Sequence, residues 1–283
     1  MNIKEKTYYL EISVNEVVTL INWILFFKAW RLTGVFSKEK EAEKQKLQCE
    51  ANDLLQKIIQ EKALKINAFA GIFSACSDNE DIVIFAQQQK FRLPVLRQQH
   101  LSEDGFCYSL SDFLKEKDDE IGLFAVSVQG AEQLAEMYQK DGDDFNAILI
   151  KTLADRLAEA AAEWLHFKVR TEIWGYAKDE LFEPKRLLAD KYQGIRPAVG
   201  YPSLPDQSII FDLDKIINFS KLQVQLTENG AMFPNASVCG MYFAHPKSKY
   251  FMIGKIDETQ LSDYARRRGK TVEKMRKWLA TNL

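Results

Sequence analysis

Carboxylates recur at four-residue intervals in DRLAEAAAEWLHFKVR, residues 155–170, as Asp155, Glu159 and Glu163. In a helix this spacing places the three side chains on one face, and His166 follows one turn later. Such a face could form an acidic wall against a cationic ligand. It could equally be a solvated acidic stripe, because stacked like charges cost only about a few tenths of a kcal/mol per pair. The spacing by itself leaves both interpretations open.

The loop GIRPAVGYPSLPDQ, residues 194–207, called the proline loop below, is the second stretch that could serve a ligand. Its prolines fix φ and remove backbone donors, while Gly194 and Gly200 permit backbone angles that other residues avoid. We therefore expect a stiff loop that is neither helix nor regular strand. Stiffness lowers the entropy lost on ligand binding, which favours a binding loop. A rigid connector would have the same composition.

The apolar segments ASVCGMYF (236–243) and KYFMIGKI (249–256) are joined by HPKS, and the stretch HPKSKYF (245–251) includes this connection. This pattern predicts a β-hairpin with Tyr250 and Phe251 close to its tip. Aromatic rings beside a stiff proline loop could stack on a planar ring such as adenine. A polar turn followed by a half-buried strand is the simpler interpretation.

Several common chemical motifs are absent from the sequence. The histidines His100, His166 and His245 are far apart and lack metal-ligand spacing, so we expect surface or packing roles and no metal site. No phosphate-binding glycine motif and no GxSxG nucleophile motif occurs. The four cysteines are scattered without a CxxC pair, which argues against a zinc site or a disulfide framework and fits a reducing cytosol.

The composition of the 283 residues is that of an ordinary globular protein, with 46% hydrophobic and 28% charged residues. A net charge of −2 gives no electrostatic footprint for nucleic acid. The most apolar run, VVTLINWILFF at 17–27, is too short to span a bilayer, which takes about 20 residues, and it lacks the features of a signal peptide. A cytoplasmic protein without nucleic-acid or membrane partners is expected.

Hydrophobic periodicity predicts the elements that must position these residues. Strands are expected at 68–73, 81–86 and 122–128, followed by the hairpin. Helices are expected from Ser13 or Asn15 to about Trp30, over 38–62 and 143–174, and on both sides of Gly269. Helices at both ends and strands between them, without βαβ alternation, indicate an α+β fold with a largely antiparallel sheet. We expect a single domain over 1–283, with an N-terminal helical part at about 1–65 and a main body at about 66–283.

Motifs along nearly the whole chain resemble the activation domain of cobalamin-dependent methionine synthase. The most specific combination is RPAVGYP within YQGIRPAVGYPSLPD (192–206), followed by HPKSKYF and DYARRRG (263–269). Further similar stretches are NWILFFKAW (22–30), ANDLLQKI (51–58), DRLAEAAAEWLHFKVR, WGYA (174–177), LTENGAMFPNASVCGMYF (226–243) and the end of the chain to residue 283.

The resemblance implies a single α+β unit with a twisted antiparallel sheet, flanked by helices, that binds S-adenosylmethionine. In the family this domain docks over a cobalamin domain and remethylates cofactor that has been oxidised to cob(II)alamin, with an electron from flavodoxin or an equivalent donor. No catalytic side chain and no metal ligand is implied for this chain. The residues implied to form the S-adenosylmethionine site are Asn22, Glu159, Arg196, Ala198, Gly200, Tyr201, Tyr250 and Phe251.

The chemistry of the ligand agrees with this assignment. A carboxylate such as Glu159 favours the sulfonium and ammonium groups, Arg196 can bind the ligand carboxylate, and rings can stack on adenine. The sequence departs from the family at Asn22, which stands where the family has an aspartate, so a favourable negative charge is missing there. Phe233 replaces the usual Trp and Val199 a common Pro, and both changes are expected to be tolerated.

The cobalamin-binding fingerprint DxHxxG of the family occurs nowhere in the chain. A stand-alone chain, which Met1 and the native-looking sequence favour, is expected to act in trans on a separate cobalamin-carrying methionine synthase. The alternative is a non-catalytic binding or regulatory protein that retains the fold. Asn22 favours this alternative, whereas the intact RPAVGYP and SKYF stretches argue against it.

Overall fold

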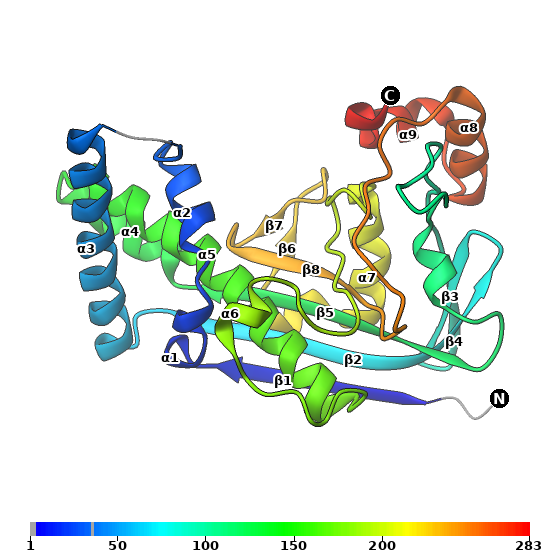
Figure 1. The fold of residues 1–283 in the computed structure, drawn as a ribbon, viewed down its shortest axis with the longest axis horizontal. Helices are drawn as coiled ribbons and strands as arrows, with labels where there is room; N and C mark the ends of the chain where they lie inside the picture. Colours follow the sequence, from blue (N-terminus) through cyan, green and yellow to red (C-terminus); the bar gives the residue numbers. More distant parts are fainter. Residues whose placement is uncertain (1–3, 35–36) are drawn as a thin grey trace.

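The computed structural model describes residues 4–34 and 37–283. Within these ranges six strands form one antiparallel sheet in the order β4-β3-β2-β5-β8, and β1 pairs with the first half of β2 (Figure 1). The strands are β1 (Glu5–Ile12), β2 (Lys65–Asp78), β3 (Asp81–Ala86), β4 (Gln89–Pro94), β5 (Asp119–Gln129) and β8 (Ser237–Tyr242). β6 (Gln225–Leu226) and β7 (Met232–Phe233) form a separate small pair. The predicted α+β class and the three predicted strands are confirmed.

Alternate side chains of each strand point to opposite sides of the sheet, and both sides carry buried apolar side chains. On β2, Ile66 and Ala68 belong to one buried cluster, whereas Phe69 and Phe73 belong to the other. The first cluster contains the buried residues of the long helix α5 (Asp144–Lys168), and the second contains those of α7 (Ile210–Ile217). The sheet is therefore a layer between helices.

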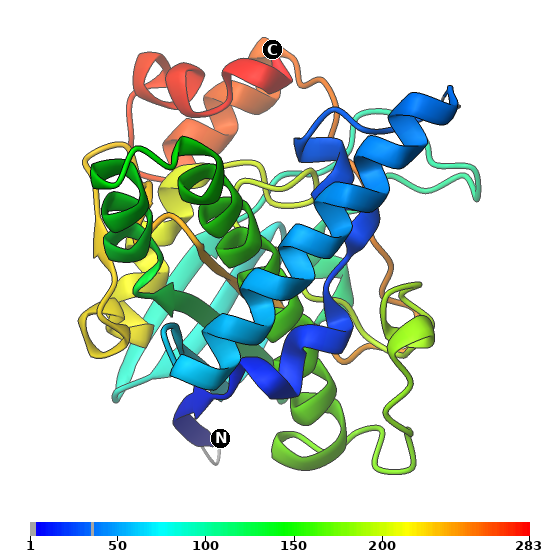
Figure 2. The same cartoon turned by 90° about the vertical axis from the view of Figure 1, so that its left-hand side faces the viewer.

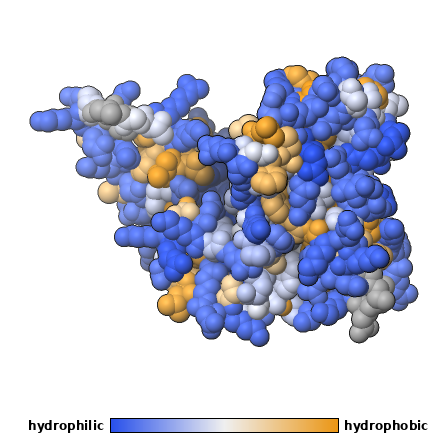
Figure 3. Space-filling view, turned by 45° about the vertical axis from the view of Figure 1, so that its right-hand side comes forward, coloured by the Kyte–Doolittle hydropathy of each residue, from blue (hydrophilic) through white to orange (hydrophobic). Residues whose placement is uncertain are grey.

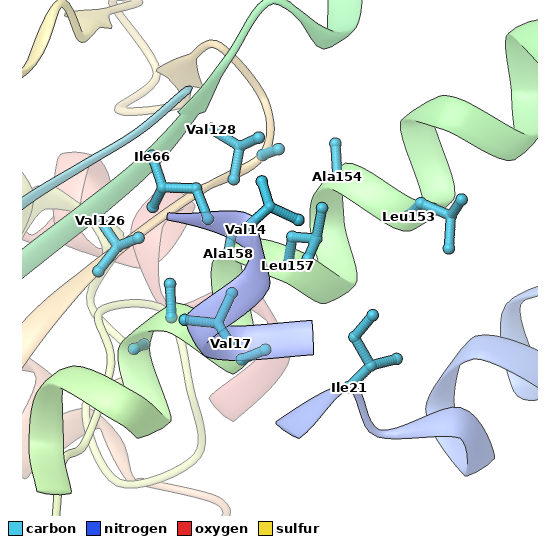
Figure 4. Packing of buried hydrophobic residues seen from close by; sticks show 14 of the residues in the cluster. Val14, Val17, Ile21, Ile66, Val126, Val128, Leu153, Ala154, Leu157 and Ala158 are labelled. Carbon is cyan, nitrogen blue, oxygen red and sulfur yellow. The ribbon is translucent and has the colours of Figure 1, made fainter. Parts of the chain in front are cut away.

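Small side chains on α5 allow this helix to pack closely on the sheet. Figure 4 shows Val14 close to Ile66 of the sheet and to Leu157 and Ala158 of α5. The predicted helix over 143–174 is confirmed as far as Lys168, after which a π-helical turn spans Val169–Ile173. Because α5 is anchored by its apolar side, its opposite side carries Glu159 toward the proline loop.

The predicted continuous helix from Ser13 to Trp30 is wrong. Ser13 caps only α1 (Val14–Val17), which is followed by a short 3-10 turn at Val18–Leu20. A new helix, α2 (Trp23–Ala29), begins after Asn22, whose Oδ1 accepts a hydrogen bond from the Leu25 backbone N–H at 3.1 Å. An Asn side chain that binds the backbone in this way starts a helix better than it continues one.

The N-terminal part is also not wholly helical, because β1 precedes α1 and joins the main sheet. The boundary near residue 65 remains a prediction. The predicted helix at 38–62 is confirmed as α3 (Lys38–Glu61), which lies across the outer side of α5 (Figure 2). The connection from β5 to α5 holds a helix that the sequence analysis missed, α4 (Ala131–Lys140).

The C-terminal helices α8 (Glu258–Arg267) and α9 (Val272–Trp278) are confirmed and lie at the far end of the molecule from α3 (Figure 1). No helix among the described residues is both long and apolar enough to cross a membrane. The face in Figure 3 is mostly hydrophilic, with apolar residues gathered around a hollow near its middle.

The second strand of the predicted hairpin is not formed. Residues 249–256 are irregular, because the proline loop occupies the free edge of β8. The Met241 backbone N–H donates to the Pro197 carbonyl at 3.1 Å, and the Val199 N–H donates to the Cys239 carbonyl at 3.0 Å. Residues 249–256 pack on the outer side of that loop, where the Ile253 N–H donates to the Pro202 carbonyl at 2.9 Å.

Candidate functional site

The proline loop lies directly against β8 because Gly240 has no side chain. A Cβ at this position would lie 2.2 Å from the Pro197 carbonyl oxygen. In the middle of the loop, Gly200 has a φ of +82° and its N–H donates to the Leu204 carbonyl at 2.8 Å. This turn presents the Tyr201 side chain toward α5. Gly200 therefore shapes the loop and does not itself line the cavity described next.

A cavity of about 250 Å³ lies between α5, the proline loop and residues 250–251. Its lining residues are Glu159, Asp190, Arg196, Pro197, Ala198, Tyr201, Pro202, Ser203, Tyr250 and Phe251. The structure thus brings together Glu159, Arg196, Ala198, Tyr201, Tyr250 and Phe251, which come from segments far apart in the sequence.

Arg196 is the central cation of this site. Its Nη1 lies 3.6 Å from Glu159 Oε2, while its Nε and Nη2 each lie 3.1 Å from Glu163 Oε2. Burial acts to lower the pKa of the guanidinium, but the attraction of Glu163 and its neighbours outweighs burial, so the net shift of the pKa is upward. Arg196 therefore stays charged and faces carboxylates on both sides.

The two tyrosines of the site hold the loop to its neighbours. The Tyr201 hydroxyl donates to Glu159 Oε1 at 2.6 Å, and the Arg196 backbone N–H donates to the Tyr250 hydroxyl at 3.0 Å. Tyr201 is 49% exposed and Tyr250 is 43% exposed, so both rings remain accessible to a ligand.

Phe251 behaves differently from its neighbour. It is buried, and its ring packs against Tyr108 and Phe113 at centroid distances of 5.9 and 6.2 Å. Of the predicted aromatic pair, Tyr250 and Phe251, Tyr250 therefore has the ring that is available to stack on a ligand. Phe251 anchors the segment, since Ser203 Oγ donates to its carbonyl at 2.5 Å.

Asn22 lies on the other side of Arg196, in a smaller cavity of about 140 Å³. That cavity shares Glu159, Asp190 and Arg196 with the first one, and Glu163 also lines it. The predicted acidic face of α5 is therefore not a uniformly solvated stripe, because Glu163 is 3% exposed. Burial raises the pKa of Glu163, and Arg196 and Arg170 act against that shift.

Asp190 and Arg156 are charged residues lining the two cavities that the sequence analysis did not name, and Glu163 was named there only as part of the acidic face. Asp190 follows α6 (Pro184–Leu187), and its Oδ1 accepts a hydrogen bond from the Tyr192 hydroxyl at 2.8 Å. Nothing in the local pattern distinguishes Asp190 from other exposed acids. Glu163 did carry a signal, the four-residue spacing from Glu159.

His166 lies in the buried layer beneath the site. Its ring stacks on Tyr242 at a centroid distance of 4.9 Å, and its Nε2 lies 3.4 Å from the Tyr176 hydroxyl. Burial, together with Arg170 and Arg196, holds the pKa of His166 well below its ordinary value. The packing role expected for this histidine is confirmed.

This neutral histidine predicts a stability change with pH. The unfolded chain takes up a proton on His166 near pH 6.5, whereas the folded chain does not, so the free energy of unfolding should decrease as the pH falls from 7.5 to 5.5. Below the pKa of the unfolded chain, His166 lowers the free energy of unfolding by up to about 1.4 kcal/mol for each pH unit. The free energy of unfolding, measured by urea titration at several pH values in this range, should change less with pH for His166→Asn than for wild type. Exposed His100→Asn is the matched control, and equal slopes for all three proteins would contradict this explanation.

The charges and rings of the main cavity suit one class of ligand. Glu159 and Asp190 can bind a cation, Arg196 can bind a carboxylate, and Tyr250 offers an accessible ring face. A zwitterionic amino-acid group joined to a planar ring satisfies all three. Among the described residues, no cluster of His, Cys, Asp or Glu could hold a metal ion.

Comparisons with known proteins agree with this geometry. Residues 13–269 match the model of the family described as "Vitamin B12 dependent methionine synthase, activation domain". The fold is similar to the crystal structure of the MetH reactivation domain bound to AdoHcy, with a TM-score of 0.90 and 38% sequence identity. The match covers 98% of this chain and 90% of that chain.

Proposed function

This chain belongs to the family of vitamin B12-dependent methionine synthase activation domains, and we propose that it binds S-adenosylmethionine in the cavity between α5 and the proline loop. The family is a module of cobalamin-dependent methionine synthase. The observation that carries the proposal is the placement of Glu159 and Arg196 side by side in the lining of one cavity, with Arg196 Nη1 3.6 Å from Glu159 Oε2. S-adenosylhomocysteine, which the similar reactivation domain binds, differs from the proposed ligand only by the transferable methyl group and its charge.

The proposed contacts follow from charge and shape. The edge of the Arg196 guanidinium that does not contact Glu163 binds the carboxylate of the ligand. Glu159 and Asp190 face the ammonium and sulfonium groups of the ligand. Tyr250 stacks on the adenine. Ala198 allows the loop backbone to approach the ligand closely, and Tyr201 closes the side of the cavity next to Glu159. Gly200 acts indirectly, because it forms the turn that presents Tyr201.

We infer that the bound ligand serves as the methyl donor in reactivation of a cobalamin-carrying methionine synthase chain, with flavodoxin or an equivalent protein as electron donor. Cobalamin, held by that partner, supplies the nucleophile. The residues of this chain bind the donor, orient its methyl group and exclude water, so no side-chain base is required.

A reconstitution experiment tests this activity. Methionine synthase that lacks its activation domain and carries oxidised cobalamin is mixed with this chain, homocysteine, methyltetrahydrofolate, an electron donor and methyl-labelled S-adenosylmethionine. We expect turnover to return, and label to reach methionine, only when both this chain and the methyl donor are present. Replacing the donor with S-adenosylhomocysteine is the control. Binding of S-adenosylmethionine without any recovery of turnover would support the non-catalytic alternative.

Asn22→Asp is expected to tighten binding of S-adenosylmethionine. Asp keeps the oxygen that caps α2 and adds a negative charge beside the cavity that contains Glu159 and Arg196. A carboxylate about 4 Å from a cation contributes up to about 4 kcal/mol at an effective dielectric constant near 20. Dehydration of the acid removes most of this, which leaves about 1 kcal/mol, or several-fold in affinity.

Titration calorimetry with both ligands checks this result. A larger gain for S-adenosylmethionine than for S-adenosylhomocysteine would place residue 22 beside the sulfonium, and an equal gain would place it beside the ammonium. The gain should shrink at high salt if the site is partly open to solvent. Weaker binding of both ligands by a folded variant would rule out the electrostatic explanation for this position.

A further inference from the structure

Glu163 is a buried carboxylate that lies behind the main cavity and does not line it. Its Oε2 accepts a hydrogen bond from Arg196 Nε at 3.1 Å and another from the Tyr192 hydroxyl at 3.4 Å. The same oxygen lies 3.1 Å from Arg196 Nη2. The side chain of Glu163 is 5% exposed and that of Arg196 is 16% exposed, so solvent screens this pair weakly.

The contact with Glu163 determines which edge of the guanidinium is available to a ligand. A guanidinium has five N–H groups: one on Nε, two on Nη1 and two on Nη2. Glu163 occupies the edge formed by Nε and Nη2. The edge formed by Nη1 and Nη2 remains, and its Nη1 faces the cavity wall at Glu159, 3.6 Å away. Paired donors on one edge are what a carboxylate needs for bidentate binding.

Glu163 also determines how strongly Arg196 competes for Glu159. While Glu163 neutralises the guanidinium, the longer contact between Arg196 and Glu159 is secondary, and Glu159 can bind a cation. Without the charge of Glu163, the guanidinium would have Glu159 as its nearest carboxylate partner in the site. Both groups that recognise the amino-acid part of a ligand would then be engaged with each other.

We propose that Glu163 is a positioning residue that orients Arg196 and keeps Glu159 available, and that it thereby confers preference for ligands with an amino-acid group. This inference rests on the proposed function. The class of ligand that this site would prefer is an adenosine thioether or sulfonium that carries a zwitterionic amino-acid chain. Ligands that contain only the adenosine part do not depend on Glu163.

The test compares two ligands that share the adenosine part. S-adenosylhomocysteine carries the amino-acid group, and 5′-methylthioadenosine lacks it. We expect Glu163→Gln to weaken binding of S-adenosylhomocysteine by about ten-fold or more, with binding of 5′-methylthioadenosine changed by less than about two-fold. Glu172→Gln, an exposed carboxylate paired with Lys168 just beyond the same helix, is the matched control and should leave both affinities unchanged.

A double-mutant cycle with Arg196→Ala distinguishes positioning from a general structural role. If Glu163 acts through Arg196, Glu163→Gln should have almost no further effect on S-adenosylhomocysteine binding in the Arg196→Ala background. Additive effects, an equal loss for both ligands, or no loss would each overturn the inference. If Glu163→Gln does not fold, Glu163→Asp, which retains the charge, and the double variant, which removes the buried pair together, supply the comparison. Absence of binding by the wild-type chain would instead contradict the proposed function.

Discussion

Arg196→Ala is expected to weaken binding of S-adenosylmethionine by about 1.5–3 kcal/mol, which corresponds to about 10- to 150-fold in the dissociation constant. Arg196 has the only cationic side chain among the residues that line the described cavity. Its loss removes a charge-assisted hydrogen bond to the ligand carboxylate, and the other arginine close by, Arg156, lines the adjoining smaller cavity and not this one. Titration calorimetry on the wild type and the variant measures the effect directly.

The variant also leaves Glu163 buried without its main partner, so its fold must be checked separately. Circular dichroism and thermal unfolding report on the fold, and 5′-methylthioadenosine reports on the adenosine part of the site. We expect this second ligand to bind the variant nearly as well as it binds the wild type. An unchanged dissociation constant for S-adenosylmethionine would assign Arg196 a structural role only.

Gly240→Ala is expected to disrupt the site from a position that does not contact the ligand. The added methyl group would lie 2.2 Å from the Pro197 carbonyl oxygen and 2.8 Å from the Ala198 Cα, and these backbone atoms can move away only if the loop leaves β8. We expect a loss of stability of about 1–3 kcal/mol and a loss of ligand affinity of about ten-fold or more, because Arg196 moves with the loop.

Gly71→Ala provides a matched control in the same sheet. A Cβ at Gly71 of β2 would crowd the rings of Phe73 and Phe69 at 2.6 and 2.7 Å, away from the proline loop. This variant should lose stability and retain ligand affinity. Urea unfolding and calorimetry on both variants separate the two effects. Full affinity in a destabilised Gly240→Ala protein would show that the pairing of the loop with β8 is not needed for binding.

Elements with strong local periodicity were predicted well from the sequence. Local hydrophobic patterns are enough to predict the strands at 81–86 and 122–128 and the helix at 38–62. The run of residues 13–30 looked like one helix because its apolar residues are dense. The cap made by Asn22 interrupts it, and this competition between side chain and backbone is not visible in hydrophobicity.

Long-range pairing accounts for the main errors. Residues 249–256 have the composition of a strand, but the edge of β8 that they would need is filled by residues 195–199. That choice depends on Gly240, about forty residues along the chain from the proline loop. The pairing of Glu163 with Arg196 is likewise a tertiary contact, which spacing on the helix could not reveal. Of the eight candidate residues that the resemblance named, the structure places six around one cavity, Asn22 in the adjoining smaller cavity and Gly200 in neither lining. Their separate contributions to binding remain predictions.

Calorimetric titration of the wild-type chain with S-adenosylmethionine, with 5′-methylthioadenosine in parallel, is the most direct test of the proposed site. We predict a saturable single-site heat for S-adenosylmethionine and distinctly weaker binding of the nucleoside, because only the first ligand has charged groups that can engage Arg196 and Glu159. No heat at millimolar S-adenosylmethionine, from protein shown to be folded and with no displacement of S-adenosylhomocysteine, would contradict it.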